Sequence, residues 1–125
     1  MVDAYEYYLK GSEEYDKGNY TEAISCFERS NEIEEHFKNY KRLYSCLMHL
    51  GNTQKAFACI ERAYQLNPRN DKTAFEYAQM LAESGDSISA QQVLAGIIQR
   101  NPDYNKAAAL ADSLRQKADA EPQDK

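Results

Sequence analysis

Basic and aromatic side chains recur at helical spacing in this 125-residue chain, and they are the residues best suited to bind a charged ligand. Lys38, Lys41 and Arg42 follow an i, i+3, i+4 pattern, so on a helix they share one face. Arginine and lysine neutralise carboxylates, and tyrosine adds apolar area together with a hydroxyl group. Side chains of this kind suit an acidic or carboxylate-bearing peptide, and the candidate binding residues are these: Tyr5, Tyr8, Ser12, Tyr15, Lys38, Lys41, Arg42, His49, Lys72 and Phe75.

A plainer interpretation of the same residues is open at this point. Lysines on a helix also serve to keep it soluble, and tyrosines also fill the gaps between packed helices. In that case the face has no ligand.

No pattern in the chain points to catalysis or to a cofactor. His36 and His49 are the only histidines, and they belong to no HExxH or Gly-x-Ser-x-Gly motif. The chain also lacks a glycine-rich phosphate loop. We therefore expect neither an enzyme nor a bound cofactor.

Three cysteines, Cys26, Cys46 and Cys59, form no CxxC pair and leave an odd number. This argues against a disulfide framework and against a zinc site. We expect them to be small packing residues, with a reactive or metal-binding role as the alternative.

The overall charge and hydropathy exclude further classes of protein. The formal net charge of −5 disfavours a general nucleic-acid binder. No run of 18 apolar residues is present to span a membrane. The N-terminus is acidic and has no apolar stretch of the signal-peptide kind, so we expect a cytoplasmic protein. The length favours one compact domain.

The elements that must position the candidate residues follow from an internal repeat. Gly18, Gly51 and Gly85 lie 33 and 34 residues apart, and each begins a similar stretch of sequence. Between them apolar residues recur every three or four positions, as on helices, and no segment shows the alternation of a strand. The pattern predicts three helix pairs, each joined by a turn at one of the glycines, with helices at 4–17, 21–35, 37–50, 53–66, 71–84 and 87–100.

The ends of the helices are also predictable. Glycine suits the left-handed residue that often ends a helix, and Thr21, Thr53 and Ser87 are expected to cap the helices that follow. A seventh helix at about 104–118, with Leu110 and Leu114 facing inward, would close the stack. The polar tail at 120–125 is expected to be disordered.

These residues resemble the tetratricopeptide repeat (TPR), whose helix–turn–helix unit has a 34-residue period. The resemblance covers about residues 4–104, with repeats at 4–36, 37–70 and 71–104 and a capping helix after them, all within one domain at 1–119. Its places are filled most completely in the second repeat, by Tyr40, Leu43, Leu47, Gly51, Ala56, Ile60, Ala63 and Pro68. The resemblance implies an all-α fold, a right-handed superhelical stack of helical hairpins. It also implies that the first helix of each pair lines a concave groove.

The resemblance further implies a protein–protein interaction adaptor that binds a peptide or protein segment in that groove. Some family members hold the carboxylate of chaperone tails with a Lys/Asn/Asn/Lys/Arg clamp, and only Lys72 agrees among the matching positions here: Tyr8, Ser12, Arg42, Lys72 and Glu76. A chaperone tail is therefore not the expected ligand. The alternative function is an assembly role, with self-association through the capping helix or the end face that carries Lys10 and Glu14. A small chaperone that shields an apolar segment is a third possibility.

Overall fold

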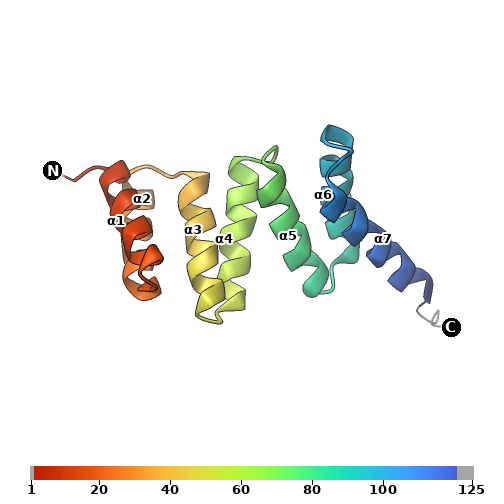
Figure 1. Ribbon diagram of the computed structural model, residues 1–125, viewed down its shortest axis with the longest axis horizontal. Coiled ribbons are helices and arrows are strands. Elements are labelled where there is room, and N and C mark those ends of the chain that lie inside the picture. Colours follow the sequence, from red (N-terminus) through yellow and green to blue (C-terminus); the bar gives the residue numbers. More distant parts are fainter. Residues whose placement is uncertain (1, 121–125) are drawn as a thin grey trace. The chain divides into compact units, whose positions relative to one another are not determined.

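The computed structural model describes residues 2–120, and this part of the chain is built from seven helices with no strand (Figure 1). The predicted all-α fold is confirmed, and every predicted helix is present with ends that differ by at most two residues. The helices are α1 (Ala4–Asp16), α2 (Tyr20–Ile33), α3 (Phe37–His49), α4 (Thr53–Leu66), α5 (Asp71–Glu83), α6 (Ser87–Arg100) and α7 (Asn105–Ala120). Ala120, expected in the tail, ends α7, and the rest of the predicted tail lies outside the described residues.

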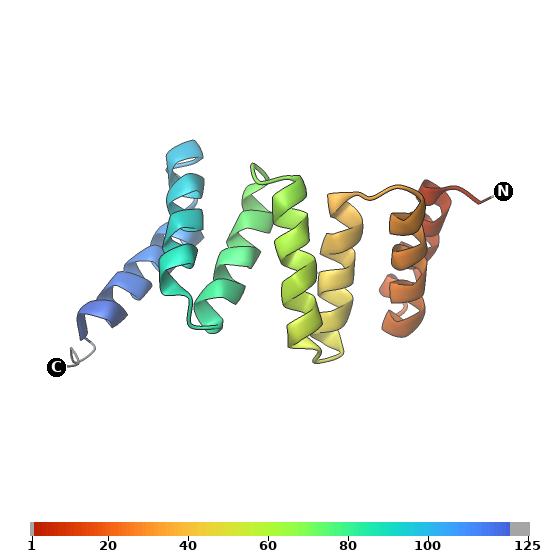
Figure 2. The same cartoon turned by 180° about the vertical axis from the view of Figure 1, so that it is seen from behind.

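The chain divides into two compact units between Pro68 and Arg69. In the first unit α1 packs on α2, α2 on α3 and α3 on α4, as both views show (Figures 1 and 2). In the second unit α5 packs on α6 and α6 on α7. The single domain over residues 1–119 stays a prediction.

The turns inside the three hairpins have the predicted glycines in the left-handed region. Gly18, Gly51 and Gly85 have φ angles of 81°, 76° and 93°. A Cβ atom would strain the backbone at these angles, although no neighbouring atom would obstruct it. The repeated glycine is therefore required by backbone conformation and not by packing.

The predicted caps at Thr21, Thr53 and Ser87 are wrong. The residue directly after each glycine takes the cap position: Asn52 Oδ1 accepts from the Lys55 main-chain N–H at 3.3 Å, and Asp86 Oδ1 accepts from that of Ser89 at 3.1 Å. Thr53 and Ser87 are already the first helical residues, so they lie inside the turn that their side chains would have to cap.

Small residues allow the helices of each pair to approach closely. Ala23, Ala56 and Ala90, the matching residues of α2, α4 and α6, are all fully buried. In α1 the close approach is at Gly11, where an added Cβ atom would lie 2.8 Å from the Phe27 ring. The Phe27 ring, itself fully buried, therefore determines that residue 11 is glycine.

The predicted cap of the second unit is present as α7, which packs on α6. Ala107, Ala111 and Leu114 are buried, and Leu110 is half-buried. The inward face predicted for this helix is therefore correct, with Leu110 at its edge.

Candidate functional site

Three of the predicted residues come together where α1 faces α3. Tyr8 and Tyr15 are two turns apart on α1 and share a face. The guanidinium carbon of Arg42 lies 5.9 Å from the centroid of the Tyr8 ring and 5.3 Å from that of Tyr15. Contacts of this kind hold the cation in place and contribute about 0.5–1 kcal/mol at exposed sites.

Neighbouring groups favour the charged form of Arg42. A side-chain hydrogen bond to Tyr8 raises the pKa of Arg42 above its ordinary value, against the opposing effect of burial. Arg42 as a residue is half-buried, and Asp16 acts on its guanidinium group as a nearby negative charge. Other arginines are paired directly with carboxylates: Arg62 with Glu35 and Arg100 with Asp71.

Ser12 lies between the two tyrosines on α1, one turn from each. Its hydroxyl oxygen is buried and has no hydrogen-bond partner within the described residues. The predicted site residue is therefore part of this face, with an unused polar group.

His49, at the end of α3, lies beside Tyr15 on the same face. Its ring stacks on Tyr20 with a centroid distance of 4.4 Å and an interplanar angle of 4°. The Tyr15 hydroxyl lies 3.5 Å from His49 Nε2. The predicted residues Tyr15 and His49 are therefore in contact, and Tyr20, which was not predicted as a site residue, holds His49 in position.

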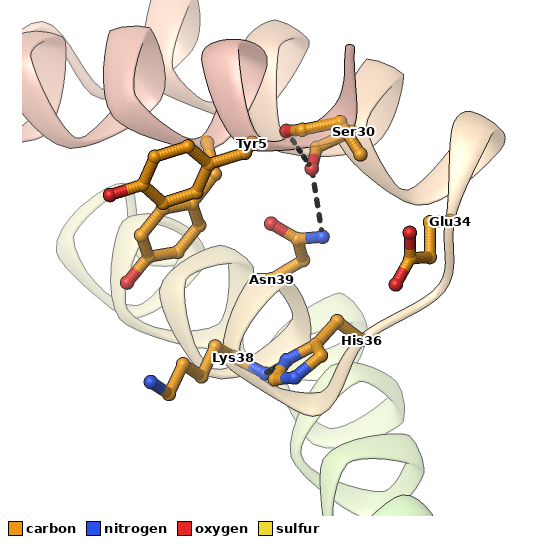
Figure 3. Close-up of a pocket in the computed structure, with 8 residues that line it drawn as sticks. Tyr5, Ser30, Glu34, His36, Lys38 and Asn39 are labelled. Carbon is orange, nitrogen blue, oxygen red and sulfur yellow. Dashed lines mark hydrogen bonds between the residues drawn. The ribbon is translucent and has the colours of Figure 1, made fainter.

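A pocket of about 240 Å³ opens at the start of α3 (Figure 3). Three of its residues, Tyr5, Tyr8 and Lys38, were predicted. The other lining residues were not predicted: Ala4, Ser30, Glu34, His36 and Asn39.

The floor of this pocket is polar and buried. Asn39 is 2% exposed, and its Nδ2 donates to Ser30 Oγ and to Asn31 Oδ1, each at 3.0 Å. Ser30 Oγ in turn donates to the Ala4 carbonyl oxygen at 2.7 Å. Asn39 Oδ1 is buried without a partner in the part of the chain that the structure describes. A signal was present in the sequence, since Ser30 stands where the second repeat has Ala63.

The predicted residues of α5 belong to the second unit. The Phe75 ring contacts the Tyr104 ring at a centroid distance of 5.8 Å, and Lys72 is exposed. In the first unit Lys38 is exposed and Lys41 is half-buried. A groove that joins α5 to α1 and α3 stays a prediction.

Of the two residues that mark the end face predicted for self-association, Glu14 has partners within the first unit. Glu14 accepts a hydrogen bond from Asn19 Nδ2 at 2.8 Å and forms an ion pair with Lys17 at 3.7 Å. Lys10 is exposed.

The cysteines lie in packed surroundings. Cys46 is fully buried, and Cys26 and Cys59 are half-buried. Burial raises the pKa of Cys46 and of Cys59 to about 11, so both thiols are protonated at neutral pH. Protonated thiols are poor nucleophiles and poor metal ligands.

Residues 2–120 contain neither a cluster of metal ligands nor a helix suited to cross a membrane. No group of three or more His, Cys, Asp or Glu side chains lies close enough to hold a metal ion. None of the helices in this range has the length and apolar character to cross a membrane.

The chain matches known sequence families and known structures. Family models of the tetratricopeptide repeat match residues 47–118 and residues 7–37. Comparison with curated proteins finds no match.

Solved structures of similar fold include YrrB, described as a TPR protein with an unusual peptide-binding site. It has a TM-score of 0.79 and 24% identity over 93% of this chain, which spans 60% of the length of YrrB. The first TPR of Spaghetti (RPAP3), bound to the HSP90 peptide SRMEEVD, has a TM-score of 0.79 and 17% identity, covering 94% of each chain. The Yersinia enterocolitica type III secretion chaperone SycD, in complex with a peptide of the translocator YopD, has a TM-score of 0.75 and 14% identity, covering 90% of this chain and 92% of SycD.

Proposed function

Because the chain belongs to the tetratricopeptide repeat family, we propose that it is an interaction adaptor that binds an acidic peptide segment on the face formed by α1 and α3. The observation that carries this proposal is Arg42, held between the rings of Tyr8 and Tyr15. Peptide complexes of two relatives of the same fold, RPAP3 and SycD, support the general mode of action.

The face has the groups that such a ligand needs. The guanidinium of Arg42 donates two parallel hydrogen bonds to a carboxylate in the proposed complex, and its fork is already oriented by the two rings. The rings supply apolar area for the peptide chain beside the carboxylate. Ser12 Oγ lies buried between the two tyrosines without a partner in the described residues.

The proposed ligand is not the tail of a chaperone. In the clamp that holds such tails, an arginine stands where this chain has Glu76, and Glu76 would repel a terminal carboxylate. We extend the binding face instead along Lys38 and Lys41 of α3.

Fluorescence anisotropy with capped seven-residue peptides tests the proposal. An acidic probe rich in Asp and Glu is compared with the same sequence in which Asn and Gln replace them. The acidic probe should bind more tightly, and its affinity should fall as salt rises, because partly exposed charge pairs are screened over about 10 Å at 0.1 M salt.

Protein variants locate the site. Arg42→Gln should weaken binding of the acidic probe, whereas Arg69→Gln, at an exposed arginine outside the face, should leave it unchanged. The charge reversal Arg42→Glu should abolish binding with the helical circular dichroism signal retained. Equal affinity of wild type and the Arg42→Gln variant for the acidic probe would place the site elsewhere.

A further inference from the structure

The pocket at the start of α3 carries an unused hydrogen-bond acceptor in its floor. We propose that this pocket binds a main-chain N–H group of an extended peptide through Asn39 Oδ1, with the adjoining apolar side chain against Tyr5 and Tyr8. This inference rests on the proposed function, because it adds a second contact for the same peptide.

The hydrogen bonds of Asn39 determine which of its amide atoms faces the pocket. Its nitrogen is held by two oxygen acceptors, Ser30 Oγ and Asn31 Oδ1. Exchanging nitrogen and oxygen would place Asn39 Oδ1 against these oxygens, one of which is on a hydroxyl already donating to Ala4. Figure 3 shows the resulting orientation, with the amide nitrogen toward Ser30 and the oxygen on the side of Tyr5. The free oxygen is therefore an acceptor directed into the pocket.

A buried acceptor without a partner is unfavourable, because it has lost its hydrogen bond to water and forms no other hydrogen bond. A ligand that donates a hydrogen bond restores the lost interaction. The pocket therefore favours a donor over an acceptor at this point.

The surrounding charges favour a neutral donor. Glu34 and Lys38 carry opposite charges, and both side chains are exposed at the rim. The start of α3 is not an anion site either, because the Lys38 main-chain N–H already donates to His36 Nδ1 at 3.1 Å. An extended peptide has neutral N–H groups that find no partner within their own chain. Its main-chain N–H therefore matches this floor better than an ammonium or phosphate group.

The pocket adjoins the proposed carboxylate site. Asn39 and Arg42 are three residues apart on α3, so they lie on one face of the helix. Tyr8 lines the pocket and also contacts Arg42. A peptide in extended form advances about 3.3 Å per residue, so an acidic residue at Arg42 brings its neighbour to Asn39.

Binding of short probes to the full chain tests this inference. The parent probe is acetyl-Asp-Leu-N-methylamide. A second probe carries a methyl group on the leucine nitrogen, which removes the donor, and a third has Asn in place of Asp. Dissociation constants and the side-chain amide signals of Asn39 are followed by two-dimensional nuclear magnetic resonance.

The N-methyl probe should bind about tenfold more weakly than the parent, as expected for one lost hydrogen bond to a buried acceptor. Only probes with the leucine N–H should shift the Asn39 amide signals. In the Asn39→Leu variant the parent should bind as weakly as the N-methyl probe, so the tenfold difference should vanish.

A second variant does not depend on the buried hydrogen bonds. Tyr5 is 66% exposed, so Tyr5→Ala should leave the fold intact and weaken the parent probe several-fold. Leu9→Ala is the matched control, since Leu9 is an exposed apolar residue of the same helix that does not line the pocket.

The outcomes separate the two proposals. Equal affinity of the parent and N-methyl probes overturns the pocket assignment, and the proposed function stands if the Asn probe still binds more weakly. A tenfold difference that persists in Asn39→Leu also overturns it, because the methyl group would then act by another route. No binding of any probe at millimolar concentration overturns both proposals.

Discussion

Asn39 and Thr73 occupy the same position, the third residue of α3 and of α5, and both are buried polar residues. Thr73 is satisfied locally: its main-chain N–H and its Oγ1 both donate to Asn70 Oδ1 at 3.0 Å. At the start of α3 the cap is His36, whose side-chain Nδ1 accepts from the Lys38 main-chain N–H and receives nothing from the Asn39 side chain. Asn39 therefore finds partners on α2 for its nitrogen, and its oxygen is left open. The comparison teaches that an accepting cap can satisfy the hydroxyl donor of Thr73, whereas the amide oxygen of Asn39 needs a donor, which no described residue supplies.

The largest loss of stability should come from a substitution in the second unit, at the buried face of α7. Leu114→Asp places a carboxylate in the buried apolar face of α7. The free energy of unfolding should fall by about 3–5 kcal/mol, as for a charge placed in an apolar interface. Urea denaturation followed by circular dichroism measures this loss. Ser113→Asp, at an exposed position of the same helix, is the control and should unfold like wild type.

A smaller loss is expected at the close approach in the first unit. Gly11→Ala introduces a Cβ atom 2.8 Å from the Phe27 ring, which is fully buried and cannot move freely. Overpacking of this kind should lower the free energy of unfolding by about 1–3 kcal/mol. An unchanged urea midpoint would mean that α1 and α2 separate at little cost.

Thr73→Val and Asn39→Leu test the comparison itself. Thr73→Val removes the bond from Oγ1 to Asn70 and should cost about 1 kcal/mol. Asn39→Leu loses two hydrogen bonds but also removes the unsatisfied oxygen and adds apolar contact, so its effect on the free energy of unfolding should be smaller.

The partners of Asn39 tolerate its loss. Ser30 Oγ still donates to Ala4, and Asn31 Oδ1 still accepts from the His36 main-chain N–H at 3.2 Å. Parallel urea titrations measure the free energy of unfolding of the two variants. If Asn39→Leu proves clearly more destabilising than Thr73→Val, Asn39 serves to join α2 to α3 and its open oxygen is incidental.

The smallest effect should be a gain. Gly96 lies inside α6, and an added Cβ atom would meet only the flexible Nη1 of Arg100 at 3.3 Å. Gly96→Ala should raise the free energy of unfolding by about 0.5–1 kcal/mol, because alanine loses less backbone freedom on folding. We expect the change in the free energy of unfolding to have opposite signs for Gly11→Ala and Gly96→Ala. The measured signs tell whether packing or backbone freedom dominates the effect at each glycine. A lower urea midpoint for Gly96→Ala would show that Arg100 cannot yield.

Much of the fold could be predicted from the sequence because its signals are local. Apolar spacing located the helices, and the repeated glycine located the turns at Gly18, Gly51 and Gly85. The caps were misplaced by one residue, from Asn52 to Thr53 and from Asp86 to Ser87. Asparagine, aspartate, serine and threonine all act as caps, so the pattern alone did not choose between neighbours.

The candidate site was predicted in part. Tyr8, Tyr15 and Arg42 were selected by helical spacing, and the structure brings them together. Asn39 was missed because a buried polar residue carries no periodic signal, and its role depends on Ser30 and Asn31 of another helix.

The amino-acid sequence by itself determined the repeat, its seven helices and the residues that each helix can present, since these depend on contacts within a few positions along the chain. Only the tertiary structure decided which side chains meet. Tyr8 and Arg42 are 34 residues apart, as are Tyr15 and His49, and their contacts exist because α1 faces α3. The open oxygen of Asn39 is likewise a product of packing, since two oxygen atoms of α2 bond its nitrogen and no described residue donates to its oxygen.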